Sequence, residues 1–363
     1  MVQGLVAAAE WLLKDRRERS PKALFAGLGL LSLFSSLLLG SCRYDTAFPE
    51  PDTTALLNLP PGFEAPDFPE DNQLTRERWD LGKRLFYEPA LSVDSSISCG
   101  SCHAQNLAFS DGRAVSLGVA NAPGLRNAPT LANVAYHPYF MREGGVTTLE
   151  MQVGVPIQEH AEFNFNFVLL SERLSQDSSY QRQSRQAYDR NIDPFVISRA
   201  IAAFERTMIS GRSPYDRYLQ GEMSELDAAA QRGKDLFFSE RASCSSCHAG
   251  FDFTAYAFEN NGLYTDYADP GRARLTGLES DRALFKVPTL RNIAVTAPYM
   301  HDGSLPDLER VVDHYRSGGN PHPNKNALVR PLDLTDQEAD DLVAFLLALT
   351  DHEFLTDPKF QPE

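Results

Sequence analysis

The chain has 363 residues, of which 42% are hydrophobic, and its formal net charge is -15. This length exceeds what one hydrophobic core usually supports, so two domains are expected. The negative charge argues against nucleic acid as a partner, because a phosphate backbone would be repelled. A small, positively charged redox protein would be attracted to such a surface, although an acidic surface also serves solubility alone.

Residues 1–42 have the pattern of an export signal. A charged start, an apolar run (ALFAGLGLLSLFSSLLLG, 23–40) and small residues follow one another, as in a signal peptide. The stretch from Leu39 to Cys42 resembles the lipobox of bacterial lipoproteins, in which the cysteine is acylated. We therefore expect a lipid anchor on Cys42, membrane association and a location in the periplasm or cell envelope. A retained membrane anchor is the alternative, and it also places the rest of the chain outside the cytoplasm.

Residues 43–71 are predicted to be a flexible tether, because the stretch is rich in Pro, Asp and Thr. Beyond it, LTRERWDLGKRLFYEP (74–89) and LDAAAQRGKDLFFSE (226–240) have the apolar spacing of amphipathic helices. DPFVISRAIAAFERTMI (193–209) opens on an Asp-Pro helix start, and TDQEADDLVAFLLALTD (335–351) has a capping residue and an apolar stripe. Strand-like alternation is nearly absent. A mainly α fold with long loops is expected.

Of the five cysteines, the four beyond Cys42 lie in two C-x-x-C-H motifs, SCGSCH (98–103) and SCSSCH (243–248). A disulfide within such a turn closes too short a loop to stabilise much, and four thiolates could instead hold zinc. Neither alternative explains the histidine behind each pair. Covalent haem c explains it, because two cysteines one turn apart form thioethers and the next histidine binds the iron. The sequence predicts two haem c groups, held by Cys99, Cys102, His103, Cys244, Cys247 and His248.

The surroundings of the two motifs also repeat. A similar helix precedes each motif, and APTLANVAYHPYFMREGGVTTLE after the first answers VPTLRNIAVTAPYMHDGSLPDLE after the second. The spacing from Pro129 to Gly144 equals that from Pro288 to Gly303. Shared composition does not produce matching Pro-Thr-Leu-x-Asn runs at matching distances. We therefore expect two tandem cytochrome c-like haem domains related by internal duplication, at 72–222 and 223–363.

From about Leu74 to Phe354 the chain resembles the family of bacterial di-haem cytochrome c peroxidases and MauG. The motifs that show the resemblance are LGKRLFYEPALS, SCGSCH, RNAPTLAN, SCSSCH, FKVPTLRNIAVTAPYMHDGSL and LERVVDHY. It implies that the N-terminal haem reacts with peroxide and that the C-terminal haem is six-coordinate and passes electrons to it. It also implies a calcium ion between the domains and a homodimer, the usual state in the family.

The resemblance implies further site residues. Glu162, in PIQEHAEF, falls where the family has an acid/base glutamate. Such a group suits the chemistry, because cleavage of the peroxide bond needs a proton to move from the inner to the outer oxygen. Gln152 and Pro156 fall at two further positions that line the same pocket. Oxygen ligands suit calcium, and the resemblance assigns them to Asn127 and to the backbone carbonyls of Thr296 and Pro298.

At the first haem the chain departs from the peroxidase pattern. Val119, which cannot bind iron, stands where those enzymes have a distal histidine that blocks the iron until reduction. His137 and His160 are the other histidines nearby, and either could substitute as a ligand, but both are predicted at loop surfaces. We therefore expect a first haem that is open without reductive activation, as in MauG.

The second departure concerns the sixth ligand of the C-terminal haem. Tyr315 stands where the peroxidases have a methionine, and MauG has tyrosine there. A tyrosinate stabilises ferric and higher states, whereas methionine raises the potential. Met300 is the competing ligand. His301 and His314 are weaker candidates, and His301 is expected near the haem edge.

The third departure concerns the tryptophan that relays electrons between the haems in the family. The only tryptophans here are Trp11, in the leader, and Trp79, in the helix before the first motif. Arg142 stands at the relay position. Electrons would then pass through Tyr139 or directly between haem edges.

Two classes of function follow. The first is an oxidoreductase that reduces hydrogen peroxide with electrons from a small cytochrome c or cupredoxin. Its MauG-like alternative, favoured by Val119 and Tyr315, withdraws electrons from Tyr or Trp residues of a partner protein. The second class is a non-catalytic di-haem electron carrier, which needs two six-coordinate irons.

Overall fold

The computed structural model describes residues 53–362, so the predicted signal and lipid site, including Cys42 and Trp11, lie outside the described residues. The α-helices up to residue 219 are α1 (Thr54–Leu57), α2 (Arg76–Phe86), α3 (Cys99–Cys102), α4 (Leu149–Gln158), α5 (Phe167–Ser175), α6 (Ser178–Tyr188), α7 (Pro194–Glu205) and α8 (Pro214–Leu219). Those that follow are α9 (Ala228–Phe237), α10 (Ala273–Thr276), α11 (Leu308–Ser317), α12 (Asp336–Leu347) and α13 (His352–Thr356).

Two short strands, β1 (Phe258–Glu259) and β2 (Phe285–Lys286), pair antiparallel with Phe258 opposite Lys286. The expected mainly α fold is confirmed, and so are the four predicted helices, which form α2, α7, α9 and α12. Within residues 53–362, no helix combines the length and the apolar character that a membrane span requires.

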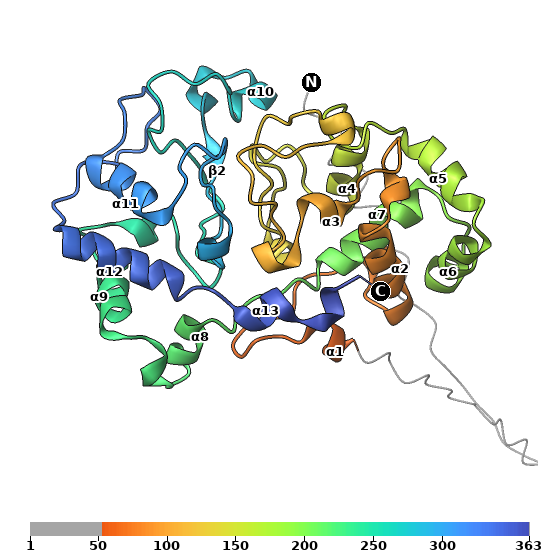
Figure 1. Cartoon of the computed structure of the whole chain (residues 1–363), viewed down its shortest axis with the longest axis horizontal. Helices are drawn as coiled ribbons and strands as arrows, with labels where there is room; N and C mark the ends of the chain where they lie inside the picture. The colour runs from red at the N-terminus through yellow and green to blue at the C-terminus, as the bar shows by residue number, and fades with distance from the viewer. Residues whose placement is uncertain (1–52, 363) are drawn as a thin grey trace, which may run out of the picture. The chain divides into compact units, whose positions relative to one another are not determined.

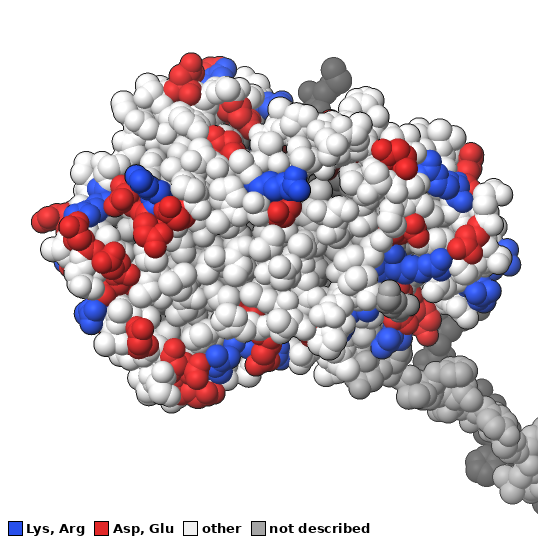
Figure 2. Space-filling model, in the orientation of Figure 1, with Lys and Arg blue, Asp and Glu red and all other residues white. Residues whose placement is uncertain are grey.

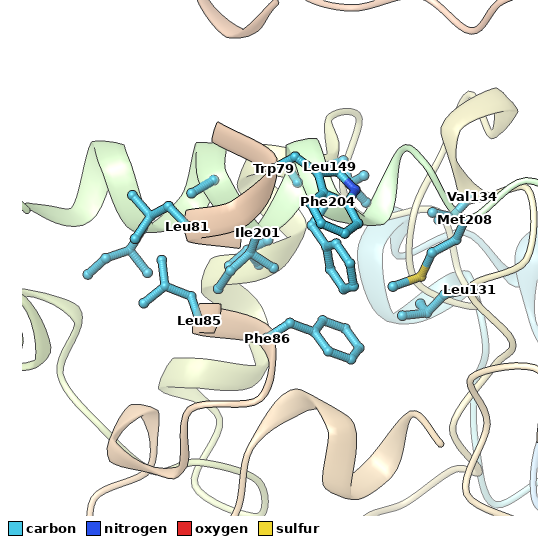
Figure 3. Close-up of a cluster of buried hydrophobic side chains, with 14 of the residues drawn as sticks. Trp79, Leu81, Leu85, Phe86, Leu131, Val134, Leu149, Ile201, Phe204 and Met208 are labelled. Carbon is cyan, nitrogen blue, oxygen red and sulfur yellow. The ribbon is translucent and has the colours of Figure 1, made fainter. Parts of the chain in front are cut away.

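The first hydrophobic core forms where α2 packs against α7 (Figures 1 and 3). The Thr75 side chain caps α2, and Asp193 caps α7 ahead of Pro194, as the start signal predicts. The helices approach closely because Gly82 has no side chain: a Cβ there would lie 1.9 Å from the carbonyl oxygen of Ala200. This contact brings the apolar side chains of both helices into one cluster, including Trp79, Leu81, Leu85, Phe86, Ile201 and Phe204.

The second core repeats this arrangement with α9 and α12, which lie side by side at the left of Figure 1. A Cβ on Gly233 of α9 would lie 1.8 Å from the carbonyl oxygen of Asp341 of α12. Thr335 and Glu338 form a capping box at the start of α12. The internal duplication therefore extends from sequence to helix packing.

The repeated Pro-Thr-Leu-x-Asn runs meet at Ser210, between α7 and α8. Asn133 and Asn292 both adopt a left-handed φ of 59°, which asparagine tolerates better than most residues. The Asn133 amide donates to the backbone oxygen of Ser210 at 2.9 Å, and the Asn292 amide donates to its hydroxyl at 2.9 Å. One buried serine thus joins the two halves.

Residues 53–71 do not behave as the predicted flexible tether. Leu56 is buried in the first core, and the ring of Phe63 packs edge-on against Phe251 with centroids 5.0 Å apart. The backbone oxygen of Leu56 accepts a hydrogen bond from Lys359 Nζ at 3.2 Å. The composition of this stretch is typical of a linker, but its few apolar side chains find partners in the folded part.

The end of the chain returns to the first core, although the predicted division assigns it to the domain at 223–363. Phe354 and Phe360 pack against Phe109 with ring centroids 5.6 and 5.7 Å away. The Gln105 amide donates to the backbone oxygen of Phe354 at 3.0 Å. The chain therefore ends beside the elements of its first half (Figure 1). The boundary between 222 and 223 stays a prediction.

Candidate haem sites and peroxide pocket

The first C-x-x-C-H motif forms a single helical turn with its histidine oriented by the backbone. Ser98 caps α3, so Cys99 and Cys102 lie one turn apart, as two thioethers require. His103 Nδ1 lies 2.7 Å from the carbonyl oxygen of Phe109, and it is the donor because a carbonyl only accepts. Burial lowers the pKa of His103. The ring is therefore neutral with Nε2 free, the form in which imidazole binds iron.

The second motif has the same design. Cys244 begins a short 3-10 turn that ends before Cys247, and His248 Nδ1 lies 3.1 Å from the carbonyl oxygen of Phe253. Phe109 and Phe253 are both buried and both left-handed, with φ of 59° and 51°. Neither acceptor is among the site residues predicted from the sequence. The available signal was a phenylalanine six residues after the first histidine and five after the second.

The structure contains neither a disulfide nor a zinc site at these cysteines, which were the two alternatives to haem. No disulfide joins Cys99 to Cys102 or Cys244 to Cys247. Within residues 53–362 no three or more His, Cys, Asp or Glu side chains gather as a metal-binding group. A four-thiolate zinc site therefore does not form.

Unpaired buried polar atoms mark both sites. Across the described chain, three buried side-chain atoms have no hydrogen-bond partner: Asp111 Oδ2, Arg142 Nε and Glu205 Oε2. Burial is the main cause of the raised pKa of Cys102 and of Cys99, and the charges of Asp111 and of Glu205 respectively add to it, so both carboxylates act on the first motif. Arg142 lines a cavity that also exposes His248. Buried polar groups normally have hydrogen-bond partners. These three atoms therefore fit sites where the polar groups of a bound cofactor would be the partners.

Glu162 acts electrostatically on the first haem site. Burial is the main cause of the raised pKa of Cys99 and of Cys102, and the charge of Glu162 adds to both. Burial and the neighbouring Glu159 raise the pKa of Glu162 to about 7. A carboxyl group with this pKa is suited to both accept and release a proton near neutral pH.

Val119 is held directly against Glu162. Its backbone N–H donates to the Glu162 carbonyl oxygen at 2.9 Å, and its side chain is buried. A Cβ on Gly118 would lie 2.1 Å from the carbonyl oxygen of Ala161, so the two loops touch closely at this glycine. The residue at the distal-histidine position thus has a buried apolar side chain, and its backbone is bonded to that of Glu162.

Neither of the other nearby histidines is free to take that place. His160 is exposed and bonds Asn164 Oδ1 through Nδ1 at 2.7 Å, as a loop-surface residue would. His137 differs from the prediction: its side chain is buried, with Nε2 3.3 Å from Asp252 Oδ2 and Nδ1 3.2 Å from Lys286 Nζ. The buried Asp252 draws this ring inward.

Gln152 and Pro156 lie four residues apart on α4, so they share one face of the helix that leads into the Glu162 loop. Both are half-buried. The Pro156 carbonyl oxygen accepts from the Phe163 N–H at 3.2 Å, which anchors the residue after Glu162 to the helix.

A cavity of about 250 Å³ adjoins the second motif and contains both candidate sixth ligands. Tyr315, on α11, lines it together with Cys244, Cys247 and His248, and burial raises the pKa of Tyr315 to about 12. Met300 also lines it, but its sulfur already accepts a hydrogen bond from Asn261 Nδ2 at 3.0 Å.

The two histidines beside these ligands are engaged elsewhere. The His301 ring stacks on Phe285 with centroids 4.2 Å apart at the cavity wall. His314 Nε2 donates to the carbonyl oxygen of Asn261 at 2.9 Å. The choice between Tyr315 and Met300 stays a prediction.

Comparison with known proteins agrees with this geometry. Residues 76–224 match the family model described as di-haem cytochrome c peroxidase, and residues 230–350 match that described as cytochrome c. The methylamine utilization protein MauG of Methylorubrum extorquens is 36% identical over 290 residues, covering 79% of this chain and 82% of that protein. The chain belongs to the di-haem cytochrome c peroxidase/MauG family.

Other members of this di-haem family are also similar. The cytochrome c551 peroxidase of Nitrosomonas europaea is 31% identical over 278 residues, covering 75% of this chain and 79% of that protein. The crystal structure of a MauG-like protein associated with microbial copper homeostasis superposes with a TM-score of 0.79 at 37% identity, covering 84% of this chain and 98% of that one. The chain is a peroxidase-type oxidoreductase with two covalent haem c groups.

The residues predicted to bind calcium come together, but in an arrangement that does not suit a divalent cation. Asn127 Nδ2 donates to the Pro298 carbonyl oxygen at 3.0 Å, so a donor already meets that oxygen. Asn127 Oδ1 accepts from the guanidinium of Arg142. Thr296 lies in the same loop, two residues before Pro298. A cation bound by Asn127 Oδ1 would meet the positive charge of Arg142.

The relay position is also clear in the structure. Trp79 is buried in the first core, where its indole N–H donates to Thr207 Oγ1 at 2.9 Å, so it is a packing residue. Tyr139 is half-exposed and packs against Phe258 of β1 with ring centroids 5.8 Å apart. Arg142, three residues on, lines the cavity of the second haem site.

Proposed function

We propose that this protein reduces hydrogen peroxide at the haem held by Cys99, Cys102 and His103. Electrons reach that site through the haem on His248 from an external donor. The observation that supports this division most is Glu162, a half-buried carboxyl group with a pKa of about 7 whose charge acts on Cys99 in the first attachment turn. Among the described residues near the second motif, the cavity has only Glu259 as a carboxylate in its lining.

The residues have distinct roles in this proposal. Haem c, when bound, supplies an iron that exchanges electrons with peroxide. His103 holds that iron through Nε2, while its Nδ1–H is fixed by Phe109. Glu162 takes the proton from the inner oxygen of peroxide and delivers it to the outer oxygen, which leaves as water. Val119 keeps the distal side apolar, and Gln152 and Pro156 shape the pocket from α4.

The test combines spectroscopy and substitution. We expect the resting ferric protein to give one high-spin and one low-spin paramagnetic-resonance signal, since only one iron has a free face. Glu162→Gln keeps the shape of the side chain but removes the proton acceptor, and we expect the reaction with peroxide to slow by about 10²–10⁴-fold. Two low-spin signals, or an unchanged rate in Glu162→Gln, would refute the proposal. Two low-spin signals would instead indicate a di-haem electron carrier.

A second candidate function is oxidation of Tyr or Trp residues on a partner protein. Tyr315 supports it, because an anionic tyrosinate favours oxidised iron, and so does the similarity to a MauG-like protein. The two functions differ in what is consumed. A classical peroxidase oxidises a reduced small cytochrome in proportion to peroxide, whereas a protein-oxidising enzyme modifies its partner without a reduced donor.

The proposed electron donor is a small, positively charged cytochrome c or cupredoxin. Acidic side chains gather over α11 and α12, on the elements that carry Tyr315 and pack beside the second haem site (Figure 2). The exposed acidic residues there are Asp307, Glu309, Asp313, Asp336 and Asp340. Such a surface would speed association at low ionic strength. The proposal also includes export, acylation of Cys42 and a periplasmic or envelope location, which the leader pattern supports. It includes a homodimer as well, which the family resemblance supports.

A further inference from the structure

Arg142 lies where the two repeats meet. Arg142 in the first repeat corresponds to His301 in the second, since each follows the matching methionine (Met141 and Met300). Both Arg142 and His301 line the cavity of the second haem site. The carbonyl oxygen of Arg142 accepts from the N–H of Lys286, in β2, at 2.6 Å. Its side chain thus starts from the first half of the chain and faces a cofactor site of the second.

One edge of the guanidinium is bound by Asn127. Arg142 Nη2 donates to the backbone oxygen of Asn127 at 3.2 Å and also to Asn127 Oδ1. Asn127 in turn donates its backbone N–H to the His301 carbonyl oxygen at 3.3 Å and its amide to Pro298. Of the oxygens that the resemblance assigns to a calcium ion, the guanidinium therefore occupies Asn127 Oδ1, and the Asn127 amide occupies that of Pro298.

The positive charge of Arg142 has no carboxylate partner. Among residues 53–362, no acidic side chain lies within ion-pair distance of it. The neighbouring Arg126 is neutralised by Glu143 and by Asp269, whose Oδ2 lies 2.7 Å from Arg126 Nε. Burial and Arg126 lower the pKa of Arg142 only to about 10, so the guanidinium stays charged at neutral pH.

A second nitrogen of this guanidinium, which is buried, lacks an acceptor. Arg142 Nε is buried without a hydrogen-bond partner. Lys286, the other cation in the cavity lining, differs because its Nζ already contacts the Tyr139 carbonyl oxygen at 2.8 Å and His137 Nδ1. A buried charged donor needs an acceptor, and haem c, when bound, would supply propionate carboxylates as acceptors. Arginine pairs with carboxylates more strongly than with neutral acceptors.

We propose that the guanidinium of Arg142 is the fixed cation between the two haem sites. It takes the place of a bound calcium ion, and it donates from Nε to a propionate of the haem attached at Cys244 and Cys247. The inference rests on covalent haem binding but not on reaction with peroxide. With Arg142 in this position, the protein does not require calcium, and one positive charge lies beside the second haem.

The first test uses the unaltered holoprotein with both haems attached. We expect elemental analysis to find no stoichiometric calcium after dialysis against the chelator EGTA. The absorption and paramagnetic-resonance spectra of both haems should be the same before and after this treatment. One tightly bound calcium per chain, or spectra that change with EGTA and recover with calcium, would overturn the replacement.

The second test measures the midpoint potential of the low-spin haem by spectroelectrochemistry. Loss of a nearby positive charge disfavours the reduced iron, so Arg142→Gln should shift the reduction equilibrium about tenfold toward the ferric form, which is about 59 mV for a one-electron couple. Arg142→Lys keeps the charge and should restore most of the potential. The matched control is Arg274→Gln, because Arg274 pairs with Glu143 but does not line the cavity.

If the low-spin haem of Arg142→Gln has the same midpoint potential as that of the unaltered protein, the proposed contact with the propionate is wrong. An equal shift in Arg274→Gln would also overturn it. If Arg142→Gln does not fold, Arg142→Lys and the calcium analysis still decide. Neither test uses peroxide, so failure here is distinct from failure of the proposed peroxidase reaction.

Discussion

The pH dependence of the peroxide reaction is the sharpest consequence of the first haem pocket. The pKa of Glu162 is raised from 4.5 to about 7 by burial and, to a smaller extent, by Glu159. A carboxyl group with a pKa of about 7 is roughly one tenth ionised at about pH 6 and roughly nine tenths ionised at about pH 8. Only the ionised form accepts the peroxide proton. The rate should therefore fall as the pH falls through about 7.

Glu159→Gln tests the cause of this pKa. Removing the like charge favours the ionised form of Glu162, so the midpoint of the rate profile should move to lower pH. Because burial is the larger cause, the change should be less than half of the rise from 4.5 to about 7, which leaves the new midpoint between about 6 and about 7. The control is Glu172→Gln, an exposed carboxylate on α5 that does not act on Glu162.

The assay is stopped-flow absorption of the ferric protein mixed with peroxide, recorded across this pH range for all three proteins. We expect the unaltered protein and Glu172→Gln to share one midpoint and Glu159→Gln to have a lower one. A midpoint that stays in place or rises in Glu159→Gln would refute the electrostatic reasoning. A flat profile in the unaltered protein would refute the role of Glu162 itself.

Three further outcomes are expected. The double substitution Cys99→Ser and Cys102→Ser removes both thioether sulfurs of the first site, so mass spectrometry of the denatured chain should find one covalent haem in place of two. Tyr315→Phe should change the low-spin absorption and paramagnetic-resonance spectrum and raise the potential of that haem, and an unchanged spectrum would assign the sixth ligand elsewhere. Gly82→Ala brings a Cβ to 1.9 Å from a backbone oxygen of α7 and should cost about 1–3 kcal/mol of unfolding free energy, seen as a lower Tm. Gly154→Ala, whose nearest neighbours would lie 3.6 Å away, should leave Tm nearly unchanged.

Short-range patterns in the sequence were sufficient for a large part of this protein. The two C-x-x-C-H motifs contain the attachment chemistry within six residues each, so no distant contact is needed to recognise them. The helices α2, α7, α9 and α12 follow from apolar spacing and caps, which are also local. The repeat of the Pro-Thr-Leu-x-Asn runs indicated the duplication, because equal spacing in one chain is visible without any structure.

Contacts between distant parts of the chain required the tertiary structure. Leu56 and Phe354 lie far apart in sequence but in one core, which the linker-like composition of residues 53–71 does not predict. His137 was expected at the surface and is buried, since its partner Asp252 comes from the other half. In the sequence Arg142 is only a replacement for a tryptophan, and its contact with Asn127 depends on the tertiary structure. Local spacing specifies which groups a helix or turn presents, whereas the energy of burying a charge depends on what the rest of the fold places beside it.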